Sequence, residues 1–168
     1  MKKYQTFSYG KKKGRVVLYL LRKHGKNGVG GLVAGPVFKE YIGLVVDETP
    51  CEDRDYRYAC LTKFESSGMN AILMDRSVFY GFKQGDVLSR TAVFHELGHC
   101  FHGHICRNGF DTKEYAERRE ESVSNQAVAP EELEADAFAA KYLGAEYVSN
   151  GLRRIIESEK RLKTAHMR

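Results

Sequence analysis

Two histidines and a glutamate within five residues carry the first chemical signal in this chain of 168 residues. His95-Glu96-Leu97-Gly98-His99 has the spacing H-E-x-x-H and lies in an apolar stretch that favours a helix. On a helix the two histidines face the same side one turn apart, so their ring nitrogens can bind one Zn²⁺. Glu96 is rotated by about 100° around the axis, where it can reach a water on the metal. The spacing therefore predicts a zinc hydrolase with His95 and His99 as ligands and Glu96 as general base; the alternative is a chance match.

A catalytic zinc site usually has a third protein ligand and an open fourth position. The segment 130–144 can supply that ligand, because a proline at its start, acidic residues in its first turns and a glycine at its end predict a helix. Glu132 and Asp136 share one face of this helix, whereas Glu134 points nearly opposite. We predict Glu132 as the third ligand and Asp136 as the acceptor for the outward N–H of a ligand histidine. The alternative is the solvated start of an ordinary acidic helix.

Taken together, the two motifs resemble those of the gluzincin metallopeptidases, over about residues 70–160. H-E-L-G-H-x-x-H in a short chain is similar to the ImmA/IrrE group, and E-L-E-A-D-A-F-A-A-K-Y-L-G is similar to the HtpX/CAAX-prenyl-protease group. The first group more often has Asn at position 136, and the second is embedded in membranes. The resemblance implies a minimal zincin-like fold and zinc-dependent hydrolysis of peptide bonds, with His95, His99 and Glu132 as ligands and Glu96 as base.

Length and composition predict a single domain over residues 1–168, since a chain with 42% hydrophobic residues can bury one core; the resemblance implies that this is a metallopeptidase domain. No run approaches the ~20 apolar residues of a membrane span, and the N-terminus lacks a hydrophobic signal core. We therefore expect a cytoplasmic protein without a membrane span. The net charge of +5 arises from basic residues that are mixed with acids or gathered at a turn. We expect these basic side chains to form a solvated surface. We expect no nucleic-acid partner, because no aromatic residues are interleaved with the lysines and arginines.

The chain divides into a part that is mainly strands, 1–84, and a part that is mainly helices, 85–168. This order predicts an α+β fold: a small N-terminal mixed or antiparallel sheet with an edge strand beside the active-site helix, then a zinc-ligand helix and a C-terminal packing helix. The glycine-rich segment 25–36 is interpreted as a flexible hairpin or linker. The strands are expected at Arg15–Leu21, Tyr41–Asp47, Tyr56–Thr62 and Asn70–Asp75, and the helices at 86–103, 113–121, 130–144 and 145–164.

A peptidase of this kind takes a protein or peptide substrate, and an extended substrate can add to the edge of a sheet. We expect the Ala71–Met74 strand to be that edge. The oxyanion donor is left open among Tyr115, Tyr142 and His166. His102 and Cys106 either line the cleft or are simply one end of the helix face. The alternative function is a non-catalytic or partner-specific zinc-binding regulator, which a fourth ligand from the chain would favour.

Overall fold

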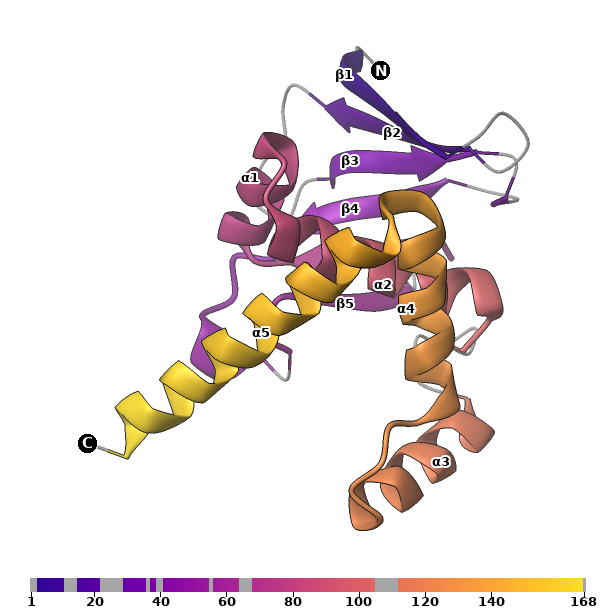
Figure 1. Cartoon of the computed structure of the whole chain (residues 1–168). Coiled ribbons are helices and arrows are strands. Elements are labelled where there is room, and N and C mark those ends of the chain that lie inside the picture. The colour runs from indigo at the N-terminus through magenta and orange to yellow at the C-terminus, as the bar shows by residue number, and fades with distance from the viewer. Residues whose placement is uncertain are drawn as a thin grey trace.

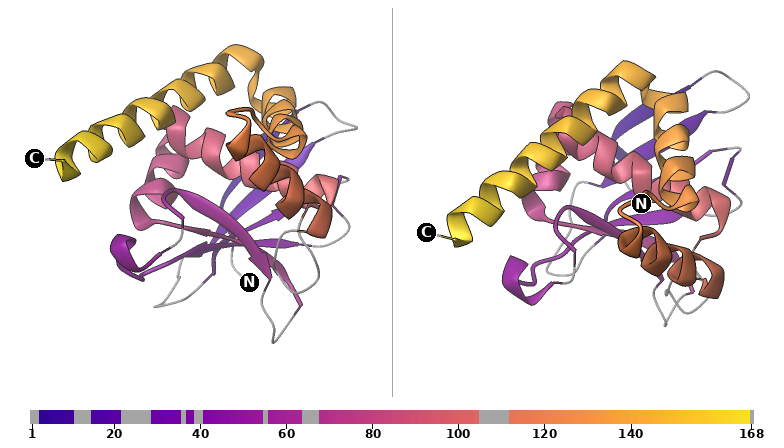
Figure 2. Two further views of the ribbon diagram at one scale, coloured as in Figure 1. Left: turned by 90° about the horizontal axis from the view of Figure 1, so that it is seen from below. Right: turned by 60° about the horizontal axis from the view of Figure 1, so that its bottom comes forward.

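The computed structural model describes residues 3–10, 15–21, 29–35, 37–38, 41–54, 56–63, 68–104 and 112–167. It confirms the predicted α+β fold: a six-stranded mixed sheet carries helices on one face (Figures 1 and 2). The strands are β1 (Lys3–Tyr9), β2 (Val16–Leu21), β3 (Val29–Ala34), β4 (Ile42–Val46), β5 (Ala59–Lys63) and β6 (Asn70–Met74). The helices are α1 (Arg76–Gln84), α2 (Val87–His102), α3 (Lys113–Ser124), α4 (Pro130–Leu143) and α5 (Ala145–His166).

The strand order corrects the prediction of which strand forms the edge beside the active helix. The order is β1-β2-β3-β4-β6-β5, so β6 lies between β4 and β5 and cannot add a substrate strand. The continuous apolar run of β6 suits the interior of a sheet rather than its edge. Ala71, Ile72 and Met74 are all buried. The edge beside α2 is β5, which pairs with β6 antiparallel on its inner side.

Three further elements differ from the prediction. β3 occupies part of the glycine-rich segment expected to be a flexible hairpin or linker, while 25–28 and 36 lie outside the described residues. β1 and α1 are not predicted by the sequence pattern. α1 follows β6 directly, because the Asp75 carboxylate accepts from the Ser77 amide at its start and Gly85, with φ of 86°, ends it.

The helix that carries H-E-x-x-H begins and ends where the sequence predicts. The Asp86 carboxylate caps it by accepting from the Ser89 amide at 2.8 Å, and Gly103 ends it with a φ of 69°. α2 packs on the sheet with one side and on α4 and α5 with the others. The largest buried side chains between α1, α2 and the sheet include Phe79, Phe82, Phe94 and Leu97. No helix among the described residues is both long and apolar enough to cross a membrane.

Two glycines, one on α2 and one on α5, allow α4 and α5 to pack closely against α2. A Cβ on Gly98 would lie 2.7 Å from the Cα and 2.8 Å from the carbonyl oxygen of Ala135 on α4. A Cβ on Gly151 of α5 would lie 2.0 Å from the hydroxyl oxygen of Thr91 on α2. The first contact is with backbone, which cannot rotate away as a side chain can. Gly98 therefore sets how near α4 approaches the histidines of α2.

Gly98→Ala should lower the free energy of unfolding by about 1–2 kcal/mol, because a clash with backbone costs towards the upper end of the usual ~1–3 kcal/mol of overpacking and the ~1 kcal/mol that alanine gains over glycine in a helix offsets part of it. Urea unfolding followed by circular dichroism measures the change. Ser149→Ala, on the exposed face of α5, is the control and should shift stability by less than about 0.5 kcal/mol. Unchanged stability in Gly98→Ala would show that the two helices do not need this close contact.

Candidate metal centre

Three predicted ligands meet where α2 and α4 cross. His95 Nε2 lies 3.0 Å from His99 Nε2 and 3.0 Å from Glu132 Oε2. His99 Nε2 lies 3.6 Å from Glu132 Oε1. These groups form a cluster, within the described residues, whose donor atoms are near enough to hold a metal ion.

The spacing of the cluster suits a small tetrahedral ion. With bonds of about 2.0–2.1 Å to nitrogen and oxygen, neighbouring ligands of a tetrahedral zinc lie ~3.3 Å apart. The two Nε2 atoms lie 3.0 Å apart, and Glu132 places one carboxylate oxygen 3.0 Å from His95 and the other 3.6 Å from His99, which is near that value. Two histidines and one carboxylate are also a donor set that catalytic zinc sites use. The donor set and its spacing therefore fit a metal ion such as zinc.

Asp136 restrains His95 through Nδ1, the ring nitrogen that is not directed at the ligand cluster. Its Oδ1 lies 2.7 Å from His95 Nδ1, one helical turn after Glu132 on the same face of α4. Accepting from Nδ1–H leaves Nε2 of a neutral His95 free for a metal. In the metal-free chain burial opposes a charge on His95, but hydrogen bonds to Asp136 and Glu132 outweigh burial and raise the His95 pKa to about 10.

The second histidine has a different partner, which the sequence reasoning missed. His99 Nδ1 lies 2.9 Å from His104 Nδ1, and His104 Nε2 lies 2.8 Å from Glu134 Oε2. His104 is buried, and burial lowers its pKa even though the hydrogen bond to Glu134 opposes this. The signal that could have found it is Gly103-His104, because the residue after a glycine helix stop folds back onto the last turn.

The three neighbouring glutamates of α4 thus have three separate partners. Glu132 is at the ligand cluster, Glu131 is buried in an ion pair with Arg118 of α3, and Glu134 bonds His104. The structure agrees with the predicted register of α4, in which Glu132 alone faces both histidines. The structure differs from the prediction at Glu134, which contacts His104 next to the site although the sequence predicts no contact there.

α3 reaches the centre through Tyr115. Its hydroxyl donates to Glu132 Oε1, and its ring stacks on His99 with centroids 5.4 Å apart. Burial favours a neutral Glu132, but hydrogen bonds from His95 and Tyr115 outweigh it and hold the Glu132 pKa well below its usual range. The carboxylate is therefore ionised and oriented before any metal arrives. Tyr115 was expected only as an oxyanion donor.

Glu96 stands beside the ligands and outside their cluster. Its Oε2 accepts a hydrogen bond from the Leu61 amide of β5 at 3.0 Å. Burial raises the pKa of Glu96, although His95 and His99 act in the opposite direction. The carboxylate thus sits between the metal ligands and the edge strand, with an affinity for protons above that of an exposed glutamate.

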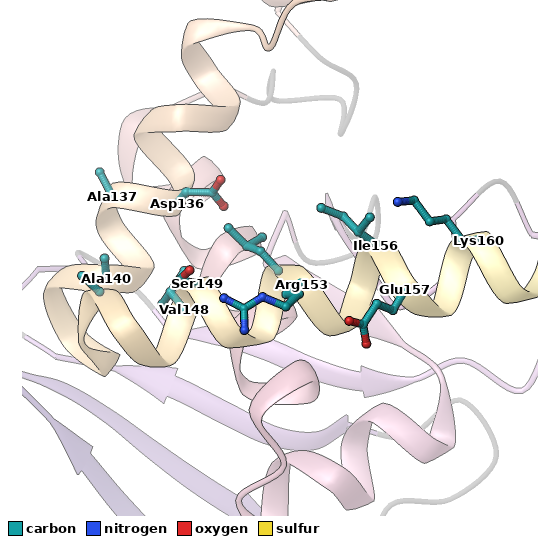
Figure 3. Close-up of a pocket in the computed structure, with 11 residues that line it drawn as sticks. Asp136, Ala137, Ala140, Val148, Ser149, Arg153, Ile156, Glu157 and Lys160 are labelled. Atoms are coloured by element: carbon teal, nitrogen blue, oxygen red, sulfur yellow. The ribbon is translucent and has the colours of Figure 1, made fainter.

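A cleft of about 380 Å³ opens onto these groups. Its polar floor includes His95, Glu96 and Glu132, and its apolar walls include Leu152 and Ile155 of α5. A larger hollow, about 640 Å³, lies between α4 and α5 (Figure 3). It shares Asp136 and Leu152 with the cleft, but no metal-ligand candidate lines it, so we place the chemistry in the smaller cleft.

The other candidate residues lie apart from the cluster or outside the description. Tyr142 packs in the core against Phe138 and does not line the cleft. His102 is exposed and stacks on His104 with centroids 5.6 Å apart. Cys106 and the His166 side chain fall outside the described part of the chain.

Comparison of the chain with family models, with curated proteins and with solved structures finds no match. The chemistry assigned to this cluster therefore rests on its own residues and their geometry.

Glu132→Ala and His95→Ala should abolish stoichiometric zinc binding, because each removes one of three ligands. Asp136→Ala should weaken binding by about 10–100-fold, since it frees the tautomer of His95. Metal content after dialysis and competition with a chelator measure both effects. Glu146→Ala, which removes an exposed acid from α5, is the matched control and should bind zinc normally. Zinc retained by Glu132→Ala would exclude this ligand set.

Zinc binding near neutral pH should release about one proton from His95, because a group with a pKa of about 10 is protonated there in the metal-free chain. Zinc affinity should accordingly rise by up to about tenfold per pH unit between pH 6.5 and 8.5. Titration calorimetry in buffers of different ionisation enthalpy counts the protons. Asp136→Ala, which lowers the pKa of His95, should release fewer. Zinc binding without proton release would show that His95 is already neutral.

Proposed function

We propose that the chain is a zinc-dependent metallopeptidase of the gluzincin type that hydrolyses peptide bonds in a protein or peptide substrate. One observation carries the proposal furthest. Glu96 is half-buried between the ligand cluster and a sheet edge, held by the Leu61 amide and outside the ligand set. At this position the Glu96 carboxylate also lines the cleft that His95 and Glu132 line, so it can reach a water or substrate held there.

The ligand cluster supports the choice of zinc. His95, His99 and Glu132 would hold the ion with one position left for water or substrate. When bound, the ion supplies a Lewis acid for the substrate carbonyl and lowers the pKa of its water towards 7. Asp136, His104 and Tyr115 each contact one ligand side chain and so limit its motion.

Glu96 would move the proton in this reaction. Its carboxylate takes a proton from the attacking water as the bond between that oxygen and the peptide carbon forms. It then delivers the proton to the nitrogen as the C–N bond breaks, which gives a free acid and a free amine. A raised pKa suits this double role, because the carboxylate must both accept and return the proton near neutral pH.

The outer edge of β5 would hold the substrate. Leu61 directs its N–H away from β6 and towards Glu96, and in an antiparallel pair alternate residues direct their polar groups to the same side. Ala59 and Lys63 therefore offer theirs on this edge too. A peptide added here as a further strand passes beside Glu96 and the ligands. The apolar cleft wall from α5 favours an apolar side chain near the scissile bond.

A second candidate function is a zinc-binding regulator without hydrolytic activity. The observation that favours it is Tyr115, whose hydroxyl comes from another helix and contacts a ligand carboxylate. If this oxygen becomes a fourth ligand, no position is left for water. Tyr115→Phe in the cobalt-substituted protein separates the two functions: the visible spectrum changes strongly only if the tyrosine binds the metal.

Glu96→Gln should keep zinc and lower hydrolysis by at least about 100-fold, because an amide cannot act as the base. The assay follows cleavage of unfolded casein and of a mixed peptide library by mass spectrometry. Glu146→Gln is the matched control, since it makes the same change at an exposed position of α5 that does not line the cleft, and it should keep activity. Equal turnover by zinc-loaded Glu96→Gln would contradict the mechanism.

A further inference from the structure

The contacts behind His99 form a chain of three side chains that ends at the surface. His99 and His104 are joined through their Nδ1 atoms at 2.9 Å, and His104 Nε2 meets Glu134 Oε2 at 2.8 Å. The side chains of His99 and His104 are only 5% and 9% exposed, whereas that of Glu134 is 53% exposed. The chain thus runs from the ligand cluster, through a buried imidazole, to a carboxylate in contact with solvent.

The direction of the hydrogen bonds follows from chemistry. An ionised carboxylate can only accept a hydrogen bond, so His104 must carry a proton on Nε2 and donate it to Glu134. A neutral His104 then has a bare Nδ1, which can only accept from His99. His99 must therefore carry its proton on Nδ1, and its Nε2, which faces His95 and Glu132, keeps the lone pair that a metal needs. The opposite arrangement would place a proton on His99 Nε2 and block the metal.

The backbone holds the two imidazoles together independently of these hydrogen bonds. The His104 amide donates to the His99 carbonyl at 3.0 Å, and the Gly103 amide donates to the Cys100 carbonyl at 3.2 Å. This pair of bonds is the Schellman motif, which brings the residue after the glycine onto the last helical turn. The Thr112 amide also donates to the His104 carbonyl at 3.0 Å. His104 is therefore fixed in place, and its ring needs no large adjustment to meet His99.

We propose that His104 and Glu134 are positioning residues that set the tautomer of His99 for metal binding, as Asp136 does for His95. The inference rests on the proposed metal site. It explains why the two ligand histidines differ: His95 meets a carboxylate directly, while His99 is one imidazole further from its carboxylate. It also assigns a role to Glu134, an exposed residue that makes no contact with the ligand cluster itself.

The experiment compares zinc affinity, by chelator competition, in His104→Phe, Glu134→Ala, Glu134→Gln and the double variant His104→Phe/Glu134→Ala. Phe keeps a ring in the buried site but offers no acceptor. His104→Phe and Glu134→Ala should each weaken zinc binding by about tenfold. This is near the lower end of the effects of residues that orient metal ligands. Glu134→Gln should recover part of the loss, because its amide oxygen still accepts from His104.

The double variant tests whether the residues act in series. If Glu134 acts only through His104, the double variant binds zinc no more weakly than His104→Phe alone. Losses that multiply would overturn the relay. Should His104→Phe fail to fold, the exposed Glu134→Ala and Glu134→Gln pair still decides, because equal affinity of Glu134→Ala and the unaltered protein also overturns the relay.

A spectroscopic readout separates positioning from simple packing. In the zinc-loaded, ¹⁵N-labelled protein, nuclear magnetic resonance should show scalar coupling between the Nδ1 atoms of His99 and His104 through their shared proton. The coupling should vanish in His104→Phe, and its absence from the unaltered protein would overturn the relay. His95→Ala distinguishes failure of the metal site itself: zinc binding unchanged by His95→Ala overturns the site, whereas zinc lost in His95→Ala but unchanged in Glu134→Ala overturns only the relay.

Discussion

The close approach of α2 and α4 at Gly98 and Ala135 is the contact on which the centre depends. The Gly98 position faces the Ala135 backbone with no room for a side chain. Ala135 lies directly before Asp136 and one turn after Glu132, so the contact places both carboxylates against the histidines of α2. A wider crossing would move Glu132 away from both Nε2 atoms at once. The glycine of the motif is thus a packing requirement that serves the metal ligands.

From this crossing, α4 distributes its carboxylates by helical geometry alone. Residues one and two positions from Glu132 are turned by about 100° and 200° around the axis. Glu131 therefore faces Arg118 of α3, and Glu134 faces His104 beyond the end of α2. One helix turn can in this way fix the neighbouring helix, supply a ligand and support a second ligand. The mutual repulsion of three acids so near in sequence is offset, because each carboxylate points to a different cation or hydrogen-bond donor.

The sequence predicts the centre well where the signal is local. The H-E-x-x-H spacing, the Asp86 cap and the Gly103 stop define α2, and helical periodicity selects Glu132 and Asp136 on α4. It predicts poorly where distant pairing decides. Which strand forms the edge depends on the neighbours of β6, and a continuous apolar run indicates burial rather than position in the sheet. Tyr115 reaches Glu132 only through the packing of α3, so spacing along the chain cannot reveal it, whereas His104 follows the Gly103 stop and has a local signal that the prediction did not use.

Each of the three ligands is restrained by a residue from outside its own helix. Asp136 of α4 holds His95, His104 beyond α2 holds His99, and Tyr115 of α3 holds Glu132. Restraint from separate elements means that the donor atoms are gathered before an ion binds, which lowers the entropy lost on binding. It also ties α3 and the end of α2 to the centre. Glu96 is held by β5 and by none of these three, so the proposed base is anchored to the edge strand rather than to the residues around the ligands.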